Sequence, residues 1–177
     1  DALLTRSLEI LSKYSKKELL PDILNLFANK SGHSGMIDGQ LIDLQGENKK
    51  LSRKKILDMY KKKTSALFEL SLLLGAINAG AGEKYLKILS RLGEVLGYIF
   101  QLKDDILDIT GDEKILGKKT GSDEKNKKSS LALLTGLKGS SKLLIDYKKQ
   151  GMKYINMLPE NKVFFTNLLE FIINREK

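Results

Sequence analysis

Three acidic residues in the run Asp104-Asp105-Ile106-Leu107-Asp108 limit most strongly what this chain can form. In a helix the run spans about one and a quarter turns, and Asp104 and Asp108 project from the same face. Like charges at that spacing repel and weaken a bare helix. A hard divalent cation would relieve the repulsion, and Mg²⁺ favours a few carboxylates together with phosphate oxygens. The run therefore predicts that Asp104, Asp105 and Asp108 bind Mg²⁺ and a phosphorylated ligand; the alternative is a solvated acidic helix end.

The rest of the chain has the apolar spacing of helices. Apolar residues recur at three and four positions, and no stretch alternates with period two. Ser15 to Glu18 fits a capping box, and Pro21 and Pro159 suit first helical turns. A charged loop is expected over 111–128. The pattern predicts an all-α fold with helices over residues 2–14, 31–46, 52–79, 83–110, 129–137, 140–158 and 159–175.

Composition narrows the class of protein. The chain has 177 residues, 41% of them hydrophobic, which predicts a single folded domain over 1–177. It contains no cysteine, which excludes disulfides and thiolate metal sites and permits a cytoplasmic location. The net charge of +9 comes from scattered lysines without a nucleic-acid-binding signature, so we expect solvated helix faces and no nucleic acid. The most apolar run, 67–81, is too short to span a membrane.

One stripe of the helix over 83–110 combines small and polar residues. Gly93, Gly97, Gln101, Asp104 and Asp108 fall within it on a helical wheel, and Phe100 lies beside it. Two glycines followed by three polar residues are not an ordinary core stripe, so we interpret them as one wall of a cavity. A glycine seam for tight helix packing is compatible with the same pattern.

Lys63 is a charge within the apolar stripe of the preceding helix, 52–79. Burial of a lone ammonium is costly, so Lys63 requires either an anionic partner or a path by which its end reaches water. Gly39, Gln40 and Asp43 share one face of a further helix. A buried hydrogen-bonded pair is the plainer explanation of those polar residues.

These motifs together resemble those of a known family. The order and spacing closely resemble the second aspartate-rich motif and following loop of trans-prenyl diphosphate synthases, most of all the bacterial farnesyl diphosphate synthase type. Lys63-Thr64 resembles the family's KT motif, and the helix with Gln40 and Asp43 resembles its GQxxDL helix. The residues that carry the main resemblance are Phe100-Gln101, Asp104 to Asp108, Gly111-Asp112, Gly117-Lys118, Gly121-Ser122-Asp123 and Lys128-Ser129-Ser130.

The resemblance implies an isoprenoid-synthase-type helical bundle around a central cavity, a homodimer, and Mg²⁺-dependent head-to-tail prenyl transfer. An allylic diphosphate would condense with isopentenyl diphosphate to give farnesyl diphosphate. Lys63, Lys118 and Lys128 would bind diphosphate, and Thr64 and Gln101 would turn oxygen dipoles toward the allylic cation. Gln40, Asp43 and Phe100 would line the cavity. Ser130-Leu131-Ala132 departs from the Thr-Tyr-Pro usual in bacterial relatives.

The start of the chain resembles a segment from the middle of that family. Asp1-Ala2-Leu3-Leu4 matches it, so the first aspartate-rich motif and the basic residues that bind isopentenyl diphosphate would lie upstream. We therefore expect residues 1–177 alone to be inactive, and the product length cannot be derived from them. Two alternatives remain: a class I terpene cyclase, which usually has an NSE-type triad, and a non-catalytic subunit of a heteromeric synthase, which would have lost motif residues.

Overall fold

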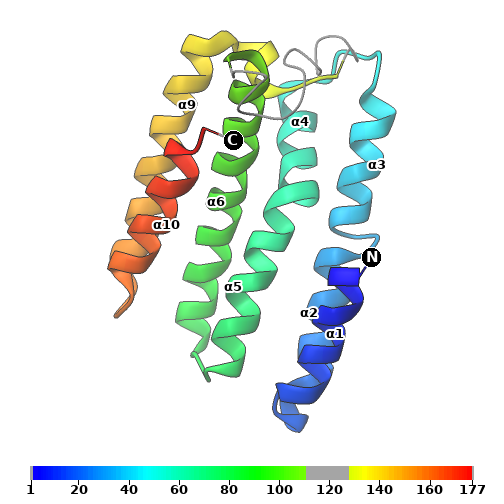
Figure 1. Cartoon of the computed structure of the whole chain (residues 1–177), viewed down its shortest axis with the longest axis vertical. Helices are drawn as coiled ribbons and strands as arrows, with labels where there is room; N and C mark the ends of the chain where they lie inside the picture. The colour runs from blue at the N-terminus through cyan, green and yellow to red at the C-terminus, as the bar shows by residue number, and fades with distance from the viewer. Residues whose placement is uncertain (1, 111–127, 177) are drawn as a thin grey trace.

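The structure, a computed structural model, describes residues 2–110 and 128–176, and these residues form helices and no strands. The prediction of an all-α fold is confirmed. Figure 1 shows the long helices running side by side, with α6 between the pair α9 and α10 and the pair α4 and α5. The helices are α1 (Ala2–Tyr14), η1 (Lys17–Leu19), α2 (Leu20–Ser31), α3 (Met36–Gly46), α4 (Arg53–Tyr60), η2 (Lys61–Ser65), α5 (Ala66–Asn78), α6 (Glu83–Thr110), α9 (Leu131–Asn156) and α10 (Lys162–Asn174).

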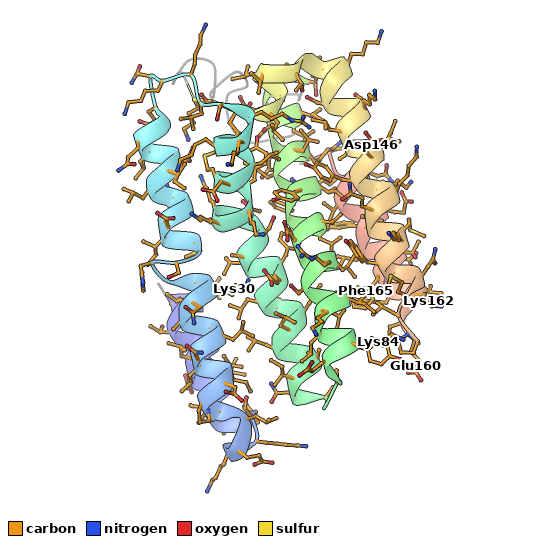
Figure 2. All side chains as sticks on the ribbon, turned by 180° about the vertical axis from the view of Figure 1, so that it is seen from behind. Lys30, Lys84, Asp146, Glu160, Lys162 and Phe165 are labelled. Atoms are coloured by element: carbon orange, nitrogen blue, oxygen red, sulfur yellow. The ribbon has the colours of Figure 1, made fainter. Side chains whose placement is uncertain are left out.

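Helix α6 is the centre of the apolar core. Its residues Ile88, Leu92, Val95, Leu96 and Ile99 are buried and pack against α9 and α10. Each such side chain stabilises the fold by roughly 1.5–3 kcal/mol relative to exposure in water. The core places the two ends of α6 at opposite ends of the bundle. Figure 2 shows Lys84 and Glu160 at the end where α6 begins, far from the acidic run.

The helix predicted over 52–79 forms as three consecutive helical segments, α4, η2 and α5, of which the middle one is not α-helical. Ser52 caps it, because its hydroxyl accepts from the Lys55 amide at 3.3 Å, and Asn78 is its last residue. Between α4 and α5, residues Lys61–Ser65 form a single π-helical turn, η2. Such turns are rare and are frequent at functional sites. This turn contains the Lys63-Thr64 pair, and periodicity could not have predicted it.

Glycines on α6 and α3 let these helices pack directly against the backbone of η2 and α5. A Cβ on Gly97 would lie 2.3 Å from Ser65 Cα, and one on Gly93 would lie 2.5 Å from Glu69 Cα. A Cβ on Gly39 of α3 would lie 2.2 Å from the Lys63 amide nitrogen. Backbone therefore fills the space beside Gly93 and Gly97. The glycine seam is confirmed for these two residues, while their place in a cavity wall, which is compatible with the seam, stays a prediction.

Helix ends differ from the sequence expectations at three places. The segment after Tyr14 forms the 3₁₀ turn η1 without a side-chain cap, and α2 follows with Pro21 in its first turn. The break expected near residue 138 lies at Gly136, whose non-helical φ of 67° only glycine adopts readily and which divides α9 at a kink. Helix α10 begins at Lys162 rather than at Pro159, after Asn161 in a left-handed conformation.

Helices α1 and α3 are among those that expose apolar side chains. Helix α1 has no buried residue and exposes Leu3, Leu4 and Leu8, while α3 exposes Ile37, Leu41 and Leu44. Helix α2 is joined to α5 by an ion pair of 2.5 Å between Lys30, labelled in Figure 2, and Glu69. Within the described ranges, no helix is both long enough and apolar enough to cross a membrane.

Candidate functional site

A small polar pocket lies where the chain brings α3, α4, η2, α6 and the start of α9 together, at the upper end of the bundle in Figure 1. Its volume is about 60 Å³. Most of the side chains around it carry charge or a hydrogen-bonding group, unlike those of the core. The lining residues are Asp43, Met59, Tyr60, Lys63, Gln101, Asp105, Lys128, Ser129 and Ser130.

Two lysines converge on one carboxylate at this pocket. Lys63 Nζ lies 2.5 Å from Asp43 Oδ2, and Lys128 Nζ lies 3.8 Å from the same oxygen. Asp43 is buried, and its contact with Lys63 provides the anionic partner that the sequence required for that lysine. Two positive charges therefore share one negative charge, and the carboxylate of Asp105, which lines the same pocket, balances the other.

A chain of hydrogen bonds runs from η2 to the acidic run. The Thr64 hydroxyl donates to Gln101 Oε1 at 2.8 Å, and Gln101 Nε2 donates to Asp105 Oδ1 at 3.2 Å. The Tyr60 hydroxyl donates to the other carboxylate oxygen of Asp105 and accepts from the Leu131 amide at 2.9 Å. These bonds hold the Asp105 carboxylate, only 3% exposed, between α4, α6 and the first residue of α9.

Tyr60 was not among the predicted site residues. It lies on the apolar stripe of its helix and reads as a core residue, although a buried tyrosine usually finds a hydrogen-bond partner for its hydroxyl. That rule is the only signal in the sequence that could have indicated its position. It does not identify Asp105 as the partner, which is 45 residues away.

The three carboxylates of the acidic run point to different surroundings. Asp105 joins the Tyr60 network, Asp108 is buried, and Asp104 forms an ion pair with Arg175. No motif or periodicity indicated Arg175 as a site residue. Among the described residues, no group of three or more His, Cys, Asp or Glu side chains is arranged to hold a metal ion. The residues that the structure describes therefore form no metal cage from protein carboxylates alone.

The remaining predicted residues lie in three situations. The Phe100 ring lies 5.4 Å from Phe68 and 3.9 Å from the Arg175 guanidinium, outside the polar pocket. Gln40 is exposed on α3 and does not line the pocket. Lys118 lies outside the described residues.

Beside the pocket, Lys62 ties η2 to α3. Its Nζ lies 2.8 Å from Asp38 and 3.2 Å from Asp58. The hydrogen bond from Lys62 lowers the pKa of Asp38, and the same bond raises the pKa of Lys62. Neighbouring Lys62 and Lys63 thus have different partners, and only Lys63 lines the pocket.

Comparison with known proteins agrees with this architecture. The sequence pattern of the polyprenyl synthetase family matches residues 1–158. The chain therefore belongs to the polyprenyl synthetase family, and its helices have the all-α isoprenoid-synthase fold.

Individual relatives carry more specific names. The chain is 33% identical over 178 residues to the farnesyl diphosphate synthase of Micrococcus luteus, covering 100% of this chain and 61% of that protein. It is also 33% identical over 183 residues to the geranylgeranyl diphosphate synthase of Cyanophora paradoxa, covering 99% and 60%. A Helicobacter pylori geranyltransferase, solved in complex with magnesium and isoprenyl diphosphate, superposes with a TM-score of 0.82 at 29% identity, covering 98% and 57%. The chain thus spans about three fifths of the length of these relatives.

Proposed function

We propose that this chain forms the later part of a prenyl diphosphate synthase that transfers an allylic group to isopentenyl diphosphate. The observation that supports it best is the meeting of Lys63 and Lys128 at one carboxylate, beside Gln101 and the acidic run. That arrangement offers two ammonium groups to a diphosphate next to carboxylate oxygens for a metal. The family match and the farnesyl and geranylgeranyl names of relatives support the same reaction class.

The residues present fit Mg²⁺ in one specific way. Mg²⁺ usually keeps several waters and is held by one or two carboxylates together with substrate phosphates, so a cage of three carboxylates is not required. We propose that Asp104, whose side chain is 36% exposed, is the direct ligand, with Asp105 and Asp108 close by. When bound, Mg²⁺ would act as a Lewis acid toward the departing diphosphate.

The side chains of this chain have defined tasks in the proposed reaction. Lys63, Lys128 and Lys118 bind the diphosphate, which takes the electron pair of the allylic carbon–oxygen bond when that bond breaks. Thr64 and Gln101 place their oxygen dipoles beside the positive charge that forms. The double bond of isopentenyl diphosphate supplies the electrons of the new carbon–carbon bond, and a proton then leaves to the released diphosphate.

The site is completed by residues outside this chain in this proposal. The exposed apolar side chains of α3 lie on the same helix as Gln40 and Asp43, so an upstream segment packed on α3 would enclose Gln40 in the cavity. The exposed apolar side chains of α1 suit a homodimer contact. We propose that residues 1–177 are one domain of a cytoplasmic enzyme and that farnesyl diphosphate is the product.

An assay of the intact protein tests the reaction. Geranyl diphosphate, labelled isopentenyl diphosphate and Mg²⁺ should yield labelled farnesyl diphosphate, identified by the chain length of the product. Residues 1–177 alone should yield none, and the upstream segment should restore the product. A cyclised hydrocarbon formed without consumption of isopentenyl diphosphate would instead indicate a cyclase. No turnover by the intact protein with any allylic diphosphate would contradict the proposal.

Lys63→Met tests the diphosphate site within that assay. We expect the KM for the allylic diphosphate to rise about tenfold or more, because a charge-assisted contact to the substrate is lost. The KM for isopentenyl diphosphate should change little. Lys62→Met is the matched control. It removes the same charge from the neighbouring residue, and Lys62 pairs with Asp38 and Asp58 instead of lining the pocket. Equal effects of the two substitutions would remove Lys63 from the allylic site.

A further inference from the structure

Arg175, just after α10, reaches across to the acidic run on α6. Its Nη2 donates to Asp104 Oδ1 and, at 2.9 Å, to the Phe100 carbonyl oxygen. Its guanidinium carbon lies 3.9 Å from the centroid of the Phe100 ring, and its side chain is only 12% exposed. Figure 1 shows the segment that follows α10 running toward the upper part of α6, as these contacts require.

These contacts differ from those of an ordinary surface ion pair. Exposed pairs contribute little because water and salt screen them. Here the guanidinium is mostly enclosed, stacks on an aromatic ring and bonds to two oxygens of one helical turn. The contact is nevertheless incomplete, because the buried Nε of Arg175 has no hydrogen-bond partner among the described residues. An unpaired buried donor raises the free energy of this arrangement and brings it closer to an alternative in which Arg175 has left Asp104.

We propose that Arg175 is an exchangeable counter-ion for Asp104. It neutralises the carboxylate in the absence of metal and must leave that oxygen for a divalent cation to bind there. The inference rests on the proposed function, because it takes Asp104 as a metal ligand. Arg175 and the cation then compete for one oxygen, and binding of metal releases the segment after α10. By thermodynamic reciprocity, the factor by which Arg175 weakens metal binding equals the factor by which metal weakens the Arg175 contact.

Metal binding to the intact protein tests this competition directly. Mn²⁺, followed by its electron paramagnetic resonance signal, is the probe, and no substrate is present. Arg175→Gln should tighten Mn²⁺ binding by about 5- to 10-fold, at the lower end of typical coupling factors. Arg91→Gln is the matched control, because Arg91 pairs with Glu94 on the same helix, roughly 20 Å along the axis from Asp104. It should leave Mn²⁺ binding unchanged.

A double-mutant cycle shows whether the effect passes through Asp104. In an Asp104→Asn background, Arg175→Gln should no longer change Mn²⁺ binding, because the shared oxygen has lost its charge. A second readout is hydrogen exchange of the Arg175 amide, which donates to the Phe171 carbonyl at 3.0 Å. Addition of Mn²⁺ should speed this exchange in the parent protein. Exchange should already be fast in Arg175→Gln and should not respond to Mn²⁺.

The outcomes separate this inference from the proposed function. Binding of Mn²⁺ that depends on Asp104 but is unchanged or weakened by Arg175→Gln overturns the counter-ion role and leaves the prenyl transferase proposal intact. An unchanged exchange rate of the Arg175 amide on Mn²⁺ binding also overturns it. Prenyl transfer that proceeds normally in Asp104→Asn overturns the assignment of Asp104, and with it both the ligand proposal and the counter-ion role.

Discussion

The two halves of helix α6 are held by different kinds of contact. From Glu83 to Ile99 the buried side chains are mainly aliphatic and pack against α9 and α10. From Phe100 to Thr110, Leu102 and Leu107 are also buried, but the polar side chains bond to partners in three other segments. These partners are Thr64, Tyr60 and Arg175. Aliphatic packing is non-directional and tolerates exchange of one apolar residue for another, whereas each polar contact depends on one particular partner.

The contrast shows how one helix combines an aliphatic core with a charged, hydrogen-bonded end. The first half contributes apolar burial, which is the dominant favourable term in folding. The second half contains charges that would be costly to bury without partners. We therefore expect substitutions in the first half to change the free energy of unfolding, and substitutions in the second half to change binding and turnover.

The largest expected effect is that of Asp104→Asn on turnover. The substitution keeps the side-chain shape and removes a proposed metal-ligand charge, so turnover should fall by about 10³-fold, or about 4 kcal/mol. Stability should change by about 1 kcal/mol, because the charge of a mostly enclosed pair is lost while the amide oxygen still accepts from Arg175 and the repulsion with Asp108 is relieved. Steady-state kinetics and urea unfolding of the intact protein measure the two quantities. Full activity with unchanged Mg²⁺ dependence would show that the second half of α6 does not bind the metal.

Leu92→Ala should have the converse effect. Leu92 is fully buried, so its truncation should lower the free energy of unfolding by about 3 kcal/mol. Turnover per folded molecule should stay within about twofold, since the free-energy change at the site is a few tenths of a kcal/mol. Urea unfolding gives the first value, and activity normalised to the folded fraction gives the second. A loss of turnover as large as that of Asp104→Asn would break the division between the two halves.

Tyr60→Phe probes the boundary between the halves. Loss of the hydroxyl leaves the Leu131 amide and one Asp105 oxygen without this partner, so stability should fall by about 1–2 kcal/mol. Turnover should also fall, because Asp105 is no longer held by Tyr60. Tyr147→Phe is a control, since Tyr147 is a half-buried tyrosine that stacks on Tyr98 and does not line the pocket. Equal changes in turnover for both variants would assign Tyr60 to packing alone.

The smallest expected effect is the pH dependence of the contribution that the Asp38–Lys62 ion pair makes to the free energy of unfolding. Lys62 lowers the pKa of Asp38, so the stabilising contribution of this carboxylate is present above its unfolded pKa of about 3.9. It is lost as pH falls through the lower folded pKa. Unfolding curves of the parent protein and Asp38→Asn should therefore differ at pH 7 and converge at acid pH. If the parent protein and Asp38→Asn still differed in stability below the folded pKa of Asp38, the Asp38–Lys62 ion pair would not be the cause of that difference.

Much of the fold could be predicted from the sequence because helices are local. The limits of α6 agree with the predicted helix over 83–110, since apolar periodicity and the glycines at its ends lie within a few residues of each position. The pattern also selected Lys63, Gln101 and Asp43 as polar residues on otherwise packed faces. The structure brings these three to one pocket, while their roles in binding remain proposals.

Other features were decided only by the tertiary structure. Asp43 meets Lys63, and Tyr60 meets Asp105, because helices distant in sequence pack side by side. Arg175 reaches Asp104 across 71 residues, because α10 returns to α6. The seam at Gly97 and the π-helical turn η2 likewise depend on how closely two backbones approach. Local sequence determines where helices form and which faces carry charge, whereas the partner of each charge is determined by packing over the whole chain.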